Sequence, residues 1–163
     1  MALSKPAAAF SPAQKILHWT VVVLLILQEF VFDGGMGRYF HAYADGKTGA
    51  WTTTSIAHLL IGTVILLLAI WRVALRATHG APAAPDDEPA LFSMLAKVTH
   101  GLLYLLLFAL PLTGLISWFG KYDPLTDVHK LLSDALLVLA GLHVAAVAVH
   151  HLVWRTNLLG RMI

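Results

Sequence analysis

Four long apolar stretches constrain this chain more than any other feature of its sequence. They run over residues 15–33, 53–76, 95–119 and 129–153 and contain few charged side chains. A helix needs about 20 apolar residues to cross the hydrocarbon core of a membrane, and together the stretches take up more than half of the chain. We therefore expect an all-α membrane protein, a four-transmembrane-helix bundle that forms a single domain over residues 1–163.

The composition also indicates a membrane protein. Hydrophobic residues make up 58% of the sequence and charged residues 12%, whereas a soluble domain is about one quarter charged. The chain has no cysteine, which excludes disulfides, thiolate ligands, iron–sulfur clusters and covalently attached c-type haem. The net charge of +2 does not indicate a nucleic-acid partner, because the basic residues lie at the ends of the spans, where they set the topology of the helices. Membrane lipid is the expected neighbour of these spans.

Local signals place the ends of the expected helices. The first begins at Ser11-Pro12-Ala13-Gln14, which combines a serine N-cap, a proline at the first helical position and a capping-box glutamine. We expect residues 34–51, rich in glycine and aromatics, to form a loop and residues 80–90, with three prolines, to form a linker. Pro111 is expected to bend the third helix.

The distribution of Lys and Arg predicts the orientation of the helices. Cytoplasmic loops carry an excess of these residues. Seven of them lie on the side of the N-terminus, the 80–90 linker and the C-terminal tail: Lys5, Lys15, Arg72, Arg76, Lys97, Arg155 and Arg161. The other side has four: Arg38, Lys47, Lys121 and Lys130. Both termini are therefore expected in the cytoplasm.

Two histidines of the last stretch share a helical face. His129 and His143 are fourteen residues apart. In a helix, fourteen residues rotate to within roughly 40° of a whole number of turns and rise by about 21 Å. The topology places His129 near the outer surface and His143 deeper, toward the cytoplasm. His18 lies toward the cytoplasmic end of the first stretch and His58 toward the outer end of the second. Depth alone therefore pairs His18 with His143 and His58 with His129.

Imidazole pairs of this kind favour haem binding. Two imidazoles from different helices are the ligands that a six-coordinate b haem requires, so two pairs at two depths predict a bundle enclosing two b haems, with these four histidines as metal ligands. Hydrogen bonding between helices or a proton relay is the alternative. A non-haem protein, such as a small transporter or a metal-ion channel, also stays open. Each ionisable group costs a few kcal/mol in hydrocarbon, so four of them at matched depths favour haem.

Further polar residues near the cytoplasmic ends are candidate contacts of a haem or a quinone. Arg72 and Arg76 lie one turn apart, and Arg is the natural partner of a carboxylate such as a haem propionate; a topology anchor is the alternative. His100 is a candidate fifth ligand. It is also a candidate contact of the inner haem's propionates or of a quinone, and a role at the membrane interface is the alternative. His150 and His151 are candidate quinone contacts, or else interfacial residues.

Several segments resemble the bacterial cytochrome b561 family, which is related to the cytochrome b subunits of Ni-hydrogenases. The similar segments cover nearly the whole chain: ILHW (16–19), IAHLLIG (56–62), HGLLYLLLFALPLTG (100–114), VHKLLSDALLVLAGLH (128–143) and AVHHLVW (148–154).

The resemblance implies a multi-pass dihaem protein of the bacterial inner membrane, with His18, His58, His129 and His143 as the ligands of two b haems. It further implies electron transfer between an outer-side donor and the quinone pool. Some members of the family are superoxide:ubiquinone oxidoreductases. Others pass electrons between a periplasmic or membrane redox partner and the quinone pool. The alternative function is therefore that of a cytochrome b subunit that serves a partner redox enzyme and has no small-molecule substrate of its own.

Overall fold

The computed structural model describes residues 9–83, 89–156 and 158–163, and this part of the chain contains helices but no β-strand. The prediction of an all-α fold is confirmed. The elements follow one another as α1 (Pro12–Phe30), α2 (Met36–Ala44), α3 (Thr53–His79), α4 (Ala90–Gly120), α5 (Pro124–Leu152) and a short 3-10 helix, η1 (Leu159–Arg161).

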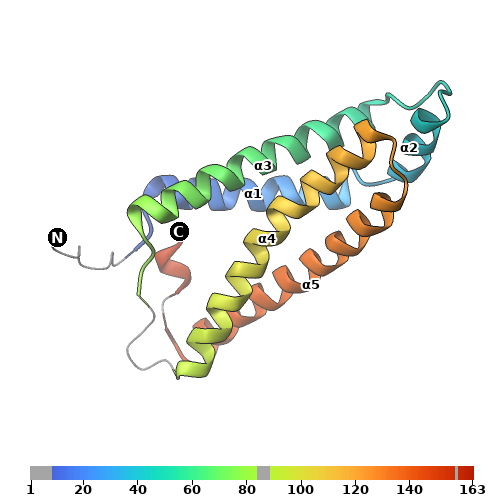
Figure 1. Cartoon of the computed structure of the whole chain (residues 1–163). Helices are drawn as coiled ribbons and strands as arrows, with labels where there is room; N and C mark the ends of the chain where they lie inside the picture. Colours follow the sequence, from blue (N-terminus) through green and yellow to red (C-terminus); the bar gives the residue numbers. More distant parts are fainter. Residues whose placement is uncertain (1–8, 84–88, 157) are drawn as a thin grey trace.

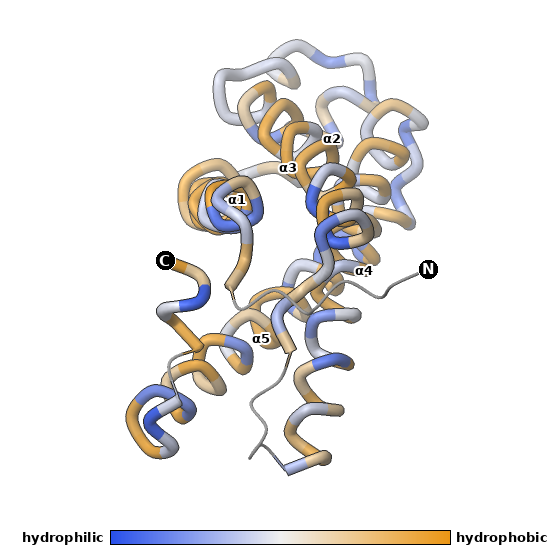
Figure 2. Tube along the Cα trace, turned by 90° about the vertical axis from the view of Figure 1, so that its left-hand side faces the viewer, coloured by the Kyte–Doolittle hydropathy of each residue, from blue (hydrophilic) through white to orange (hydrophobic). Residues whose placement is uncertain are grey.

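The four long helices α1, α3, α4 and α5 correspond to the four predicted spans. Each is long and apolar enough to cross a membrane, and hydrophobic colouring follows them along most of their length (Figure 2). Helix α4 begins five residues before the predicted span and is continuous through Pro111. Helix α5 also begins early, because Pro124 occupies its first turn, where a missing backbone N–H costs nothing.

Capping residues explain where two of the long helices begin. The side chain of Ser11 accepts a hydrogen bond from the backbone N–H of Gln14, whose side chain bonds back to Ser11, as predicted. Thr52 and Ser55 form the same reciprocal pair at the start of α3. Each capping box satisfies two backbone groups that a helix start would leave unpaired.

The segment expected to be a loop, residues 34–51, contains a helix. Helix α2 follows Gly35, which adopts a left-handed φ of 84°, a conformation that glycine reaches without steric cost. Phe40 of α2 is buried at 3% exposure and its ring lies 6.3 Å from that of Trp118 on α4. Packing of α2 against α4 stabilises this helix, and a nine-residue segment has too little periodicity to reveal such packing by itself.

The helices pack in chain order, with α1 on α3, α3 on α4 and α4 on α5. Helix α2 lies at one end of the bundle, and α3 and α4 diverge from that end toward the other, where α1 begins and α5 ends (Figure 1). A cluster of buried apolar side chains joins the middle parts of α1, α3 and α4 and consists of Val21, Ile65, Ala69 and Leu107.

Large apolar side chains cover much of the outside of the long helices. Leu60, Leu67, Leu105 and Val138 are each at least 60% exposed. Such residues are the natural neighbours of lipid tails, because the hydrocarbon of a bilayer is as apolar as they are.

Candidate functional site

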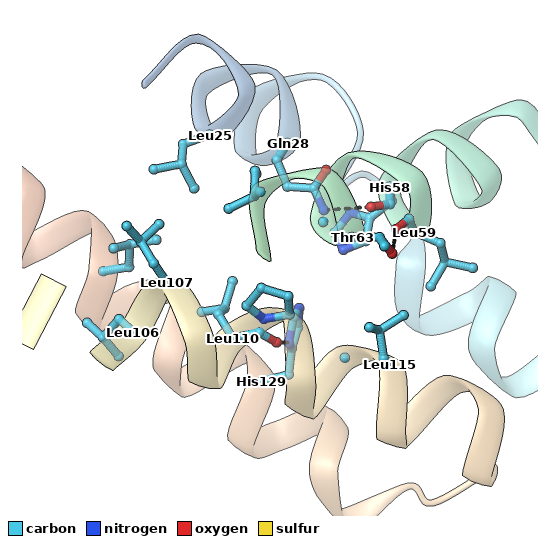
Figure 3. A pocket seen from close by; sticks show the side chains of 15 residues that line it. Leu25, Gln28, His58, Leu59, Thr63, Leu106, Leu107, Leu110, Leu115 and His129 are labelled. Atoms are coloured by element: carbon cyan, nitrogen blue, oxygen red, sulfur yellow. Dashed lines mark hydrogen bonds between the residues drawn. The ribbon is translucent and has the colours of Figure 1, made fainter. Parts of the chain in front are cut away.

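One pair of histidines, called the outer pair after the predicted orientation, consists of His58 and His129 and lies near the α2 end of the bundle. His58 of α3 and His129 of α5 have ring centroids 6.2 Å apart, with planes at 63° to one another. Both rings line a pocket between the helices (Figure 3). The cavity between them has a volume of about 40 Å³. Its remaining walls are mostly apolar and include Leu25, Leu106 and Leu110.

Helix α4 shapes the seat of His129. A Cβ added to Gly114 would lie 2.9 Å from Cε1 of His129 and 3.2 Å from its Nδ1, so only glycine lets the imidazole approach this closely. The close approach brings Nδ1 of His129 to 2.9 Å from the carbonyl oxygen of Leu110 and 3.2 Å from the hydroxyl of Thr113. A carbonyl oxygen only accepts hydrogen bonds, so Nδ1 carries the hydrogen and Nε2 keeps a free lone pair.

His58 is held in a similar way from the end of α1. Its Nδ1 lies 3.2 Å from the carbonyl oxygen of Phe32, to which it donates. Nε2 of this imidazole therefore also keeps its lone pair. The backbone of His58 is fixed as well, because Nε2 of Gln28 donates to its carbonyl oxygen over 3.0 Å. A backbone carbonyl bonded to the second ring nitrogen is the usual support of a metal-binding histidine.

The spacing of the outer pair fits two ligands of one haem iron. An imidazole–metal bond is about 2 Å long and a ring nitrogen lies about 1 Å from its ring centroid, so imidazoles on opposite sides of an iron have centroids about 6 Å apart. The observed 6.2 Å matches this value. The porphyrin would supply the other four ligands, so two imidazoles are sufficient. The apolar walls suit the flat hydrocarbon surface of the ring.

An inner pair lies toward the other end of the bundle. The ring centroids of His18 on α1 and His143 on α5 are 6.5 Å apart, with planes at 69°, again close to the spacing of two axial ligands. His100 of α4 lies nearer to His143, at 5.1 Å. That distance is too short for two imidazoles on opposite sides of one iron. The geometry therefore favours His18 over His100 as the partner of His143, and places His100 beside the inner pair.

Arg72 lies against the inner pair. Its Nη2 is 3.1 Å from Nδ1 of His18, and its guanidinium lies over the ring of Tyr104 at 5.6 Å. Since Arg only donates, Nδ1 of His18 accepts in this arrangement and Nε2 carries the hydrogen. Nε2 of His18 can bind a metal only if its hydrogen moves to Nδ1. Arg72 then loses its hydrogen bond to Nδ1, and its guanidinium becomes free to pair with a carboxylate. Arg76, one turn further along α3, is exposed.

The two histidines at the end of α5 lie elsewhere. His150 is buried, its Nδ1 is 3.0 Å from the hydroxyl of Thr156 and its ring meets the edge of Trp154 at 4.5 Å. His151 is exposed. The structure thus gives His150 a place in the packing of the C-terminal segment and leaves His151 on the surface.

Sequence reasoning missed three features of the outer site. Gln28 anchors His58, Gly114 seats His129, and Glu29 accepts a hydrogen bond of 2.8 Å from Ser133 of α5. One signal was present, since Gln28 and Glu29 are polar residues inside an apolar stretch, and such residues are functional candidates by default. Nothing in the sequence distinguished Gly114 from the other helical glycines.

The histidines of the site therefore form two pairs rather than one cluster. Among the described residues, no group of three or more His, Cys, Asp or Glu side chains is placed to hold a metal ion. Two imidazoles at each of two depths can hold two planar metal cofactors. Because both His129 and His143 belong to α5, one helix sets the separation of the two positions, a rise of about 21 Å along its axis.

Comparison with known proteins identifies the family of this chain. The profile of the prokaryotic cytochrome b561 family matches residues 9–163. Cytochrome b562 of Cereibacter sphaeroides is 28% identical over 156 residues, and the probable superoxide oxidase CybB of Yersinia pestis is 26% identical over 174 residues; each comparison covers 94% of both chains. Four of its helices are long and apolar enough to span a membrane, so the chain is a multi-pass bacterial membrane protein. It is a b-type cytochrome that transfers electrons, and it belongs to the prokaryotic cytochrome b561 family.

Proposed function

We propose that the protein holds two b haems and carries electrons across the bacterial inner membrane, between a donor on the outer side and the quinone pool. The observation that carries this proposal is the pair of spacings, 6.2 Å between His58 and His129 and 6.5 Å between His18 and His143. Each pair joins two helices, and the two pairs lie at different depths.

Each bound haem supplies an iron that takes up and gives back one electron. The residues of the chain position it and tune its surroundings. His58 and His129 donate from Nδ1 to main-chain carbonyls, which fixes the ring orientation and makes Nε2 a better electron donor to a metal. Apolar walls such as Leu106 and Leu107 keep water from the site, so a small change of local charge has a large effect on the potential.

The inner end provides the polar groups for a haem carboxylate and a quinone. Arg72 and Arg76 are the candidate partners of the inner haem's propionates, Arg72 being the one that lies at the site. His100, beside His143, is the candidate contact of a quinone oxygen or of a propionate. His150 and His151 remain candidate quinone contacts at the end of α5. Quinone reduction near the cytoplasmic side completes the path from the outer donor.

The outer donor has two candidates. Superoxide is favoured by the relative described as a probable superoxide oxidase, and Arg38 and Lys121 would help to attract a small anion. We expect the purified holoprotein to show haem reduction on the millisecond scale when mixed with a superoxide source, and transfer to added quinone. A slow reaction, together with co-purification of a periplasmic or membrane redox enzyme, would instead favour a cytochrome b subunit that serves a partner.

The visible spectrum of the purified protein tests the haem proposal. We expect a Soret band and a reduced α-band of b-type haem, with two components in a redox titration. His58→Ala and His129→Ala should remove one component, and His18→Ala and His143→Ala the other. His100→Ala is the matched control, and it should retain both. A spectrum without b-type bands, or loss of the inner component in His100→Ala but not in His18→Ala, would contradict the assignment.

A further inference from the structure

A buried tryptophan at the outer end of α4 has a hydrogen-bond donor without a partner. Trp118 is 3% exposed, and its Nε1 is one of two buried side-chain atoms that lack a hydrogen bond among the described residues; the other is Oε1 of Gln28. Buried polar groups are nearly always paired, and an exception calls for a specific explanation such as an absent ligand.

Aromatic neighbours hold the indole in place. Tyr43 of α2 stacks on Trp118 at 5.3 Å with planes 5° apart, and Trp51 meets it edge-on at 5.5 Å. Phe40 covers a further part of the ring at 6.3 Å. With these contacts the side chain cannot turn its N–H toward water without losing the stack. The N–H is therefore fixed in direction before any ligand binds.

Trp118 lies one helical turn outward from Gly114, the residue that seats His129. A haem held by His58 and His129 would direct its two carboxylates toward the nearer membrane surface, because charge is costly in hydrocarbon. Trp118 lies in the last turn of α4, at the end of the helix nearest that surface. Lys121 adds positive charge at the same end, with its Nζ 4.8 Å from the centroid of the Tyr43 ring.

We propose that Nε1–H of Trp118 donates a hydrogen bond to a propionate of the outer haem. This inference rests on the proposed haem binding and makes Trp118 a binding residue of the outer site. The choice between the two unpaired atoms follows from chemistry, since a carboxylate only accepts hydrogen bonds and Oε1 of Gln28 is itself an acceptor. A hydrogen bond to an ionised acceptor is also stronger than one between neutral groups.

The variant Trp118→Phe tests this role, with Trp51→Phe as the matched control. Phenylalanine keeps a stacking six-membered ring at position 118 and removes the donor together with the five-membered part of the indole, and Trp51→Phe makes the same reduction in ring size. Trp51 belongs to the same aromatic cluster but is 52% exposed. In the purified holoprotein we expect Trp118→Phe to release the outer haem to an excess of apomyoglobin about tenfold faster, the effect of one charge-assisted hydrogen bond. The inner haem should be unchanged, and Trp51→Phe should stay within about twofold of the wild type.

The midpoint potential of the outer haem gives a second readout. Loss of the donor leaves the propionate charge less compensated, which favours ferric iron, so the potential should fall in Trp118→Phe and not in Trp51→Phe. Unchanged release and potential in Trp118→Phe would overturn the proposal. Equal release of both haems would also overturn it, because a general loss of packing would then explain the effect.

Haem dimethyl ester, which lacks the carboxylates, tests the same contact in the wild-type protein. Wild type reconstituted with the ester should lose its outer haem at least about tenfold faster than wild type reconstituted with haem. In Trp118→Phe the ester should have a correspondingly smaller effect, because the two changes remove one interaction. Equal retention of haem and ester at the outer site of the wild type would overturn the inference even if Trp118→Phe did not fold. Absence of b-type haem from the wild type would instead refute the proposed function.

Discussion

At the residue scale, the outer site depends on the absence of one side chain. Gly114 allows the ring of His129 to lie against α4, where a Cβ would come within 2.9 Å of Cε1. This contact also lets Nδ1 reach the carbonyl oxygen of Leu110 one turn earlier in the helix. The bond to Leu110 determines which nitrogen faces the pocket, so a single missing methyl group decides the orientation of a candidate metal ligand.

Gly114→Ala should therefore lower the occupancy of the outer haem about tenfold while the inner haem remains. The helix itself should not suffer, because alanine favours a helix over glycine by about 1 kcal/mol. Gly101→Ala is the control in the same helix, since nothing lies within 4 Å of a Cβ at that position. The pyridine haemochrome measures the haem content of each variant, and a redox titration separates the outer component from the inner one. Full outer-haem occupancy in Gly114→Ala would contradict the account of His129.

At the element scale, adjacent residues at the end of α1 connect this helix to two others. Gln28 donates to the backbone of His58 on α3, and Glu29 accepts from Ser133 on α5 over 2.8 Å. Helix α1 otherwise packs mainly on α3. The bond to Ser133 is therefore the polar contact that keeps α1 near the helix carrying His129 and His143.

Ser133→Ala should lower the stability of the detergent-solubilised protein by about 1 kcal/mol, the usual net contribution of such a hydrogen bond. Glu29→Gln is the matched control, because an amide oxygen can still accept from the Ser133 hydroxyl. Thermal unfolding followed by far-ultraviolet circular dichroism measures both. We expect a lower midpoint for Ser133→Ala and a smaller change for Glu29→Gln; the reverse order would show that the charge of Glu29, rather than the hydrogen bond, matters.

At the scale of the whole molecule, the two ends of the bundle differ. Helix α2 marks one end, and the start of α1 and the end of α5 mark the other (Figure 1). The distribution of basic residues predicts that the α2 end faces the outside. In the proposed function, this orientation decides which histidine pair would meet the outer donor and which pair would face the quinone.

Single cysteines can test the orientation directly, because the chain has no cysteine of its own. Thr48, between α2 and α3, and Ala77, near the end of α3, are both exposed. A membrane-impermeant maleimide should label Thr48→Cys in intact spheroplasts, and Ala77→Cys only after the membrane is permeabilised. The opposite pattern would reverse the assignment of outer and inner sites without changing the pairs themselves.

The sequence alone determined the four spans, their expected orientation and the depth of each histidine. Hydropathy, the positions of Lys and Arg and the rise of a helix are properties of single segments, so they can be read without knowing how the segments pack. Depth alone also predicts that His58 pairs with His129 and His18 with His143.

Only the tertiary structure decided what surrounds these histidines. The place of His100 beside the inner pair, the role of Gly114 and the unpaired N–H of Trp118 all depend on distances between helices. Helix α2 likewise depends on packing against Trp118. Hydropathy and helical periodicity describe one face of one helix, whereas these features arise where the faces of two helices meet.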